Sequence, residues 1–124
     1  MTNHILLYLG SLVLFFWGIA HLVSTRSVVK GFGDLTMDNQ RIITMEWIIE
    51  GVALIFIAVV VASVSYLDSS SVISRTIYWL SFVMLNTLSV VSLFTGFRIN
   101  FLPFKLCPII FTIASILIVA GSFI

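Results

Sequence analysis

The sequence predicts an all-α membrane protein with four transmembrane helices in an up-down antiparallel bundle. Of its 124 residues, 60% are hydrophobic and only 9% are charged. A soluble domain usually carries about 25% charged residues, and no soluble core of this size could bury so much apolar surface. The apolar residues form four long runs, and the short connections between them favour neighbouring antiparallel helices. We therefore expect one four-helix domain that comprises residues 1–124.

The lengths of the four apolar runs suit a bilayer. The predicted spans are residues 5–24, 42–66, 76–96 and 106–124. About 20 helical residues at 1.5 Å per residue match a hydrocarbon core of roughly 30 Å. A cleavable signal peptide is the alternative interpretation of the first run. The length of that run, the absence of Lys or Arg before it and the absence of a small-residue cleavage site after it favour a span.

Three polar connections separate the spans and carry turn and capping signals. They comprise residues 25–41, 67–75 and 97–105. Gly31-Phe-Gly33 marks a turn in the first connection, and Thr36, Asp38 and Asn39 are all candidate N-caps of the helix that follows. Pro108 suits the first turn of the last helix, because a proline there loses no helical hydrogen bond.

The basic residues predict the orientation in the membrane. The first and third connections, which lie on the same side, contain Arg26, Lys30, Arg41, Arg98 and Lys105. The opposite side contains only Arg75. Cytoplasmic loops carry the excess of Lys and Arg, so residues 25–41 and 97–105 are expected in the cytoplasm and both termini outside.

Two acidic residues lie early in the second apolar run, where ionisable side chains are rare. Glu46 and Glu50 are four residues apart, so they share one face of a helix. Helical rise places them roughly 6 Å and 12 Å inside the cytoplasmic end of the span. Ionisable groups at such depths are costly and usually functional. His21 in the first span and Asn86 in the third lie in the same half, so we expect these four side chains to converge.

Each polar residue has a candidate functional role and a structural alternative. The candidate acid/base residues are Glu50, Glu46 and His21. The candidate ligand-binding residues are Trp17, Trp47, Asn86 and Arg41. In the structural alternative, Glu46 forms an interfacial ion pair with Arg41 or Arg26, and Glu50 forms a hydrogen bond to Asn86 or Trp47. Arg41 would then be an anchor on the cytoplasmic side.

Three kinds of function fit this pattern. The first is the binding of a small lipophilic molecule, with acid/base chemistry on it, because apolar walls with a few converging polar groups are typical of ligand sites. The second is proton or divalent-cation transport, in which His21, Glu46 and Glu50 would be the metal ligands. The third is a non-catalytic accessory subunit of a membrane complex.

The composition and the charge of the chain indicate which classes of partner to expect. A net charge of +1 without a basic stripe argues against nucleic-acid binding. The single cysteine, Cys107, excludes an internal disulfide, and we expect it to be a packed or lipid-facing thiol without a role. The expected partners are the lipid bilayer, a small lipophilic ligand and either a second copy of the chain or a membrane complex. No cofactor is identified.

The general plan resembles that of two groups of membrane proteins. Four compact spans, Trp17-Gly-Ile-Ala-His21 near the end of the first span and Glu46 and Glu50 at the start of the second resemble small DoxX-like proteins. The plan is also similar to the emopamil-binding, sigma-2-type bundle. These resemblances imply a lipophilic pocket with intramembrane acids, or a subunit of a redox complex. Neither family's motif can be placed on this sequence residue by residue, so the resemblance assigns no catalytic role.

The predicted orientation can be tested with two reporters fused at the C-terminus. We expect activity from a reporter that works only outside the cytoplasm and none from a reporter that works only inside it. An exclusively cytoplasmic signal would contradict the topology.

Overall fold

Four long α-helices account for nearly all of the chain in the computed structural model, which describes residues 1–124. These are α1 (Thr2–Gly31), α2 (Met37–Asp68), α3 (Val72–Phe94) and α4 (Leu102–Phe123), and a short 3-10 turn, η1 (Gly96–Arg98), lies before α4. All four helices are long and apolar enough to cross a membrane. The predicted fold class is therefore confirmed, and the chain is a multi-pass integral membrane protein in contact with the lipid bilayer.

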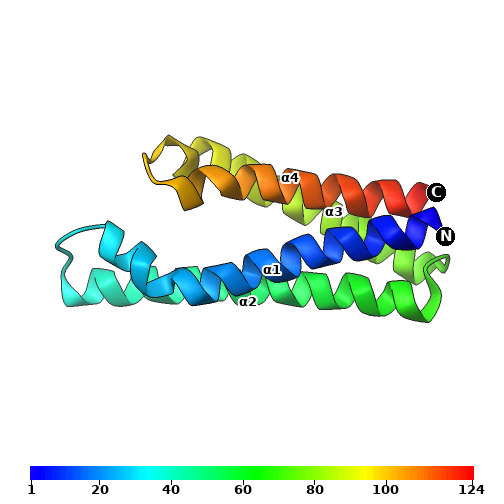
Figure 1. Ribbon diagram of the computed structural model, residues 1–124, viewed down its shortest axis with the longest axis horizontal. Coiled ribbons are helices and arrows are strands. Elements are labelled where there is room, and N and C mark those ends of the chain that lie inside the picture. Colours follow the sequence, from blue (N-terminus) through cyan, green and yellow to red (C-terminus); the bar gives the residue numbers. More distant parts are fainter.

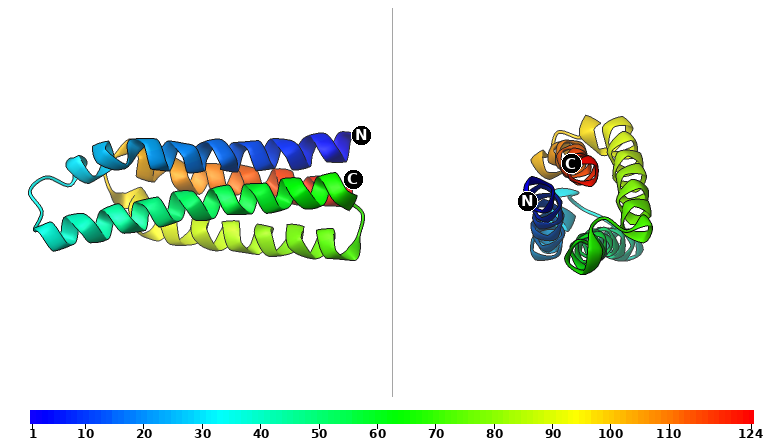
Figure 2. Two further views of the ribbon diagram at one scale, coloured as in Figure 1. Left: turned by 90° about the horizontal axis from the view of Figure 1, so that it is seen from below. Right: turned by 90° about the vertical axis from the view of Figure 1, so that its right-hand side faces the viewer.

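The helices run up and down, so both termini lie at one end of the bundle (Figure 1). The end-on view in Figure 2 shows the helices as a ring in chain order, with α4 beside α1. Each helix thus packs against two neighbours, and the interface between α2 and α3 is the smallest of the four. This arrangement is the predicted antiparallel bundle.

Local capping explains where the helices begin. The Thr36 hydroxyl accepts a hydrogen bond of 3.3 Å from the backbone N–H of Asn39, so Thr36 is the N-cap among the three candidates. Ser71 caps α3 in the same way, at 3.1 Å from the N–H of Ser74. Gly33 has φ of +76°, a backbone conformation that favours glycine, and confirms the predicted turn.

The first connection is much shorter than the predicted 25–41. Only residues 32–36 lie outside the helices, because α1 continues to Gly31 and α2 begins at Met37. At 1.5 Å per residue these two helices are about 45–48 Å long, well beyond a hydrocarbon core of roughly 30 Å. Their shared end extends past the connection between α3 and α4 (Figure 1). Arg26, Lys30 and Arg41 therefore lie on helical turns.

The last helix also begins earlier than predicted. It starts at Leu102 instead of residue 106, with Pro103 in its first turn. The prediction that Pro108 lies in the first turn is wrong, because Pro108 is inside the helix. Its carbonyl accepts a hydrogen bond of 3.0 Å from the Ser89 hydroxyl, which links α4 to α3.

The hydrophobic core is concentrated in the half of the bundle that holds the termini. It combines side chains from all four helices, among them the fully buried Leu14, Leu54, Tyr78 and Phe111. The Tyr78 hydroxyl lies 2.9 Å from the Ser65 hydroxyl, so this buried polar group is satisfied inside the core. The opposite half contains the groove described below.

Glycines allow the closest approach of α1 to α2. A Cβ atom added at Gly18 would lie 2.6 Å from Ile55 Cγ1 and 2.8 Å from the Gly51 carbonyl oxygen. One added at Gly51 would lie 2.9 Å from His21 Cβ and 3.0 Å from the Gly18 carbonyl oxygen. Small residues at helix interfaces permit such backbone contact in membranes. Here the contact places His21 directly opposite the helical turn that carries Glu50.

Gly51→Ala is expected to lower the free energy of unfolding by about 1–3 kcal/mol, because overpacking forces the two helices apart. Gly31→Ala is the matched control, since its added Cβ would meet the Phe101 ring at an ordinary 3.4 Å. Thermal unfolding in detergent measures both variants. Equal melting temperatures for Gly51→Ala and Gly31→Ala would show that the close approach is not a packing constraint.

Candidate functional site

His21 is the buried centre of the candidate site. Its side chain is 1% exposed and lies on α1. Its Nδ1 atom is 2.9 Å from the Trp17 carbonyl oxygen. A carbonyl oxygen accepts but cannot donate, so Nδ1 must carry the proton of this hydrogen bond. In the neutral ring, Nε2 then carries the lone pair.

Two indoles fix the orientation of the imidazole. The Trp47 ring stacks on the His21 ring with centroids 4.2 Å apart and an interplanar angle of 21°. The Trp17 ring meets it edge-on at 5.4 Å. The Trp47 indole N–H also donates a hydrogen bond of 2.7 Å to the His21 carbonyl oxygen, across the interface between α1 and α2. The ring therefore has little freedom to turn away from α2.

Glu50 faces the remaining nitrogen of the imidazole. Its Oε2 atom lies 3.6 Å from His21 Nε2, a contact that becomes an ion pair when the imidazole is protonated. The Glu50 side chain is 32% exposed, so one side of the carboxylate is accessible. His21 Nε2 is buried and has no hydrogen-bond partner. Glu50 is therefore the acidic side chain that faces this unpartnered nitrogen.

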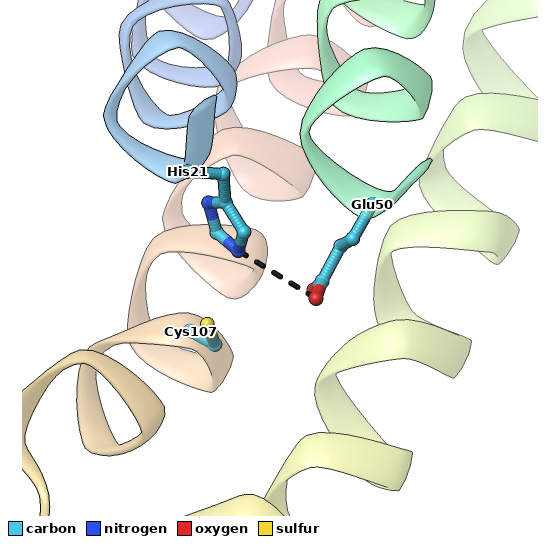
Figure 3. A group of neighbouring side chains, drawn as sticks. All are labelled: His21, Glu50 and Cys107. Carbon is cyan, nitrogen blue, oxygen red and sulfur yellow. Dashed lines mark ion pairs between the residues drawn. The ribbon is translucent and has the colours of Figure 1, made fainter. Parts of the chain in front are cut away.

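Cys107 is the third reactive side chain at this position. It lies on α4, is 4% exposed, and its sulfur lies within 4.8 Å of the ligand atoms of His21 and Glu50. Figure 3 shows the three side chains converging from three different helices. The sequence predicts no role for Cys107, because a lone cysteine carries no signal for a site. The structure starts α4 at Leu102, four residues or about 6 Å before the predicted start of the span.

An apolar groove opens beside these residues, between α2, α3 and the start of α4. Its volume is about 710 Å³, and 12 of its 17 lining residues are hydrophobic. Glu46, Glu50 and Cys107 supply polar groups on one side, and the hydroxyls of Ser92 and Thr95 supply them on the other. The groove lies beside the interface between α2 and α3, which is the smallest of the four helix interfaces.

The structure separates the other predicted site residues. Glu46 is exposed at the groove, and it forms no ion pair with Arg41 or Arg26. The Asn86 amide donates a hydrogen bond of 2.8 Å to the Phe82 carbonyl oxygen on its own helix. Asn86 forms no hydrogen bond to Glu50 and is not among the residues that line the groove.

The remaining aromatic and basic residues have different positions. Trp47 lines the groove, whereas Trp17 and Arg41 do not. Arg41 is exposed near the start of α2. The Trp17 indole N–H is buried without a hydrogen-bond partner. Phe104 is an additional aromatic residue of the groove, and its ring meets the Trp47 ring at 5.4 Å.

Comparison of the chain with protein-family models, curated proteins and solved structures finds no match. The resemblance to DoxX-like and emopamil-binding proteins therefore stays a prediction.

Trp47→Phe is expected to lower the free energy of unfolding by about 1 kcal/mol or more, since it removes a buried hydrogen bond while keeping an aromatic ring. Trp79→Phe is the control, because Trp79 is 45% exposed and does not share the buried hydrogen bond of the Trp47 indole. Thermal unfolding of both variants in the same detergent gives the comparison. A larger loss for Trp79→Phe would contradict the structural role of Trp47.

Proposed function

We propose that this protein binds a small amphiphilic molecule in the groove between α2 and α3, with the molecule's polar group at Glu50. The observation that carries the proposal is the position of the Glu50 carboxylate. It lies on the wall of a largely apolar groove and is paired at 3.6 Å with a buried imidazole.

The size and lining of the groove support a ligand of modest size. Ligand pockets usually have volumes of about 300–1,000 Å³ and combine apolar walls with a few oriented polar groups. The groove, at about 710 Å³, has both properties. Its walls include the exposed side chains of Ile49 on α2 and Met84 and Val91 on α3. It therefore opens on the lateral surface of the bundle, where a molecule dissolved in the bilayer would meet it.

Glu50 determines the chemistry of the polar end of the ligand. An ionised carboxylate accepts hydrogen bonds and attracts cations, so a hydroxyl or an amine is the complementary group. A hydrogen bond to a charged group is worth about 1.5–3 kcal/mol. The aromatic faces of Trp47 and Phe104 are part of the same groove and would also attract an amine.

His21 can exchange a proton with Glu50, so one proton can be held by either side chain of the pair. When Glu50 is protonated, the neutral imidazole can take the proton at Nε2 and leave a carboxylate and an imidazolium. The proton moves between the two groups without leaving the protein. A bound hydroxyl or amine at Glu50 could thus gain or lose a proton through the pair, which is the arrangement that general acid/base catalysis requires.

A panel of lipophilic amines, sterols and quinones tests this proposal through thermal stability in detergent. We expect the amines and the hydroxyl-bearing compounds to raise the melting temperature of the wild type. In Glu50→Gln the affinity is expected to fall about 10–100-fold, which corresponds to the loss of a charged hydrogen bond.

Two further variants test whether the response depends on Glu50 in particular and on the space in the groove. Glu46→Gln changes an exposed carboxylate one turn from Glu50 and is expected to keep most of the response. Ala53→Phe adds bulk inside the groove and is expected to abolish binding of every compound while leaving Glu50 in place. The proposal fails if no compound stabilises the wild type, or if Glu50→Gln and Ala53→Phe respond as the wild type does.

A further inference from the structure

Three side chains of different chemistry meet at the back of the groove. His21, Glu50 and Cys107 come from α1, α2 and α4, and one ligand atom from each lies within 4.8 Å of the others (Figure 3). Glu46 is not part of this group. The trio therefore differs from the His21, Glu46 and Glu50 set that the sequence predicts for a metal.

The hydrogen bonding of His21 leaves a lone pair directed at the other two residues. Nδ1 is the donor to the Trp17 carbonyl, so Nε2 of the neutral ring is an acceptor or a metal ligand. That nitrogen is fully buried without a hydrogen-bond partner and lies 3.6 Å from Glu50 Oε2. A lone pair and a carboxylate oxygen repel each other, so a cation belongs between them. That cation is either a proton or a metal ion.

We propose that His21, Glu50 and Cys107 bind a single divalent ion of the zinc type. A neutral imidazole, a carboxylate and a thiolate are all ligands that Zn²⁺ accepts. The charges of the carboxylate and the thiolate cancel the charge of the ion, so the loaded site is neutral inside an apolar bundle. Binding releases the thiol proton of Cys107 to the solvent, because only the thiolate is a ligand.

The geometry needs only a small adjustment. Zinc bonds of about 2.0 Å to nitrogen and oxygen and about 2.3 Å to sulfur imply tetrahedral separations of about 3.3 Å between nitrogen and oxygen and about 3.5 Å from either of them to sulfur. The His21 and Glu50 ligand atoms, at 3.6 Å, are already close to the first of these separations. The two separations from Cys107 Sγ are at most 4.8 Å, so a shift of about 1 Å of the thiol toward the other two ligand atoms closes the site. Glu50 can adjust as well, because its side chain is the most exposed of the three.

The hydrogen bonding around His21 is also typical of a metal centre. A histidine that binds a metal usually donates its other N–H to a carbonyl or a carboxylate, as His21 does to Trp17. Three protein ligands leave a fourth position open. Glu50 and Cys107 line the groove whereas His21 does not, so that position faces the groove. The inference goes beyond the proposed function, because the ion needs no molecule in the groove.

A cysteine nucleophile is the competing use of the same residues, and the hydrogen bonding disfavours it. In a nucleophile, base and orienting-acid arrangement, the nucleophile and the acid sit at opposite nitrogens of the histidine. Here the Trp17 carbonyl occupies Nδ1 and Glu50 lies at Nε2, so no free nitrogen opposite the acid is left for Cys107. Three ligand atoms within 4.8 Å of one another are instead the arrangement of a shared ion.

The test uses the full chain in detergent, stripped with a chelator and titrated with Zn²⁺ and Co²⁺ in the absence of any lipophilic compound. We expect one ion per chain and, for Co²⁺, a thiolate-to-metal charge-transfer band in the near ultraviolet. That band is measured on the wild type, so it does not depend on whether a variant folds. Cys107 is the only cysteine, so the band reports this residue alone.

Variants then locate the other ligands. Cys107→Ser is expected to remove the band, and Glu50→Gln to weaken Zn²⁺ binding at least about tenfold, as loss of metal-site partners typically does. Glu46→Gln is the matched control and is expected to keep both the band and the affinity. The absence of stoichiometric binding, or Co²⁺ binding without a thiolate band, overturns the proposal. Failure of the metal test would leave ligand stabilisation of the metal-free protein intact, so the two proposals fail separately.

Discussion

The close approach of α1 to α2 at Gly18 and Gly51 is the contact on which the candidate site depends. Each glycine faces the backbone of the other helix, with no room for even a methyl group. At this separation the Trp47 indole reaches the His21 carbonyl oxygen at 2.7 Å, and Glu50 reaches the imidazole at 3.6 Å. A wider spacing would leave these polar groups without partners, which is costly where no water can replace them.

His21 is buried, so the chemistry of the site depends on which cation occupies the position between its Nε2 atom and Glu50. Its Nδ1 proton is donated to the Trp17 carbonyl, and its Nε2 atom has no hydrogen-bond partner. Proton and metal ion are alternative occupants of the position between this nitrogen and Glu50. With a proton there, Glu50 and His21 form an acid/base pair beside the groove. With a metal ion there, Cys107 joins them and the open coordination position faces the same groove.

The two halves of the bundle are packed differently. One half contains most of the hydrophobic core, and the other contains the groove. The half that holds the termini contains the hydrophobic core, in which residues such as Leu14 and Phe111 are completely buried. The opposite half contains the groove, bounded by the small interface between α2 and α3. A tightly packed half can hold α1, α2 and α4 in register, while the loosely packed side leaves space for a ligand. The site lies at the junction of the two halves.

Much of the fold could be predicted from the sequence because the signals for membrane helices are local. A run of apolar residues must be helical in a bilayer, since every backbone polar group needs a partner within its own segment. The predicted ends of the helices were less accurate, because the polar turns of α1 and α2 beyond the apolar runs carry no hydropathy signal. The start of α4 was also misplaced, because Pro103 and Pro108 were both compatible with a first helical turn.

The sequence by itself determined four membrane-spanning helices, their antiparallel order and the presence of Glu50 and His21 in the same half of the bundle. Depth follows from counting residues along a helix, but rotation about the helix axis does not. Only the tertiary structure decided that Glu50 meets His21, that Asn86 bonds to its own helix and that Cys107 completes the group. The physical reason is that packing at Gly18 and Gly51 sets how α1 and α2 are turned toward each other.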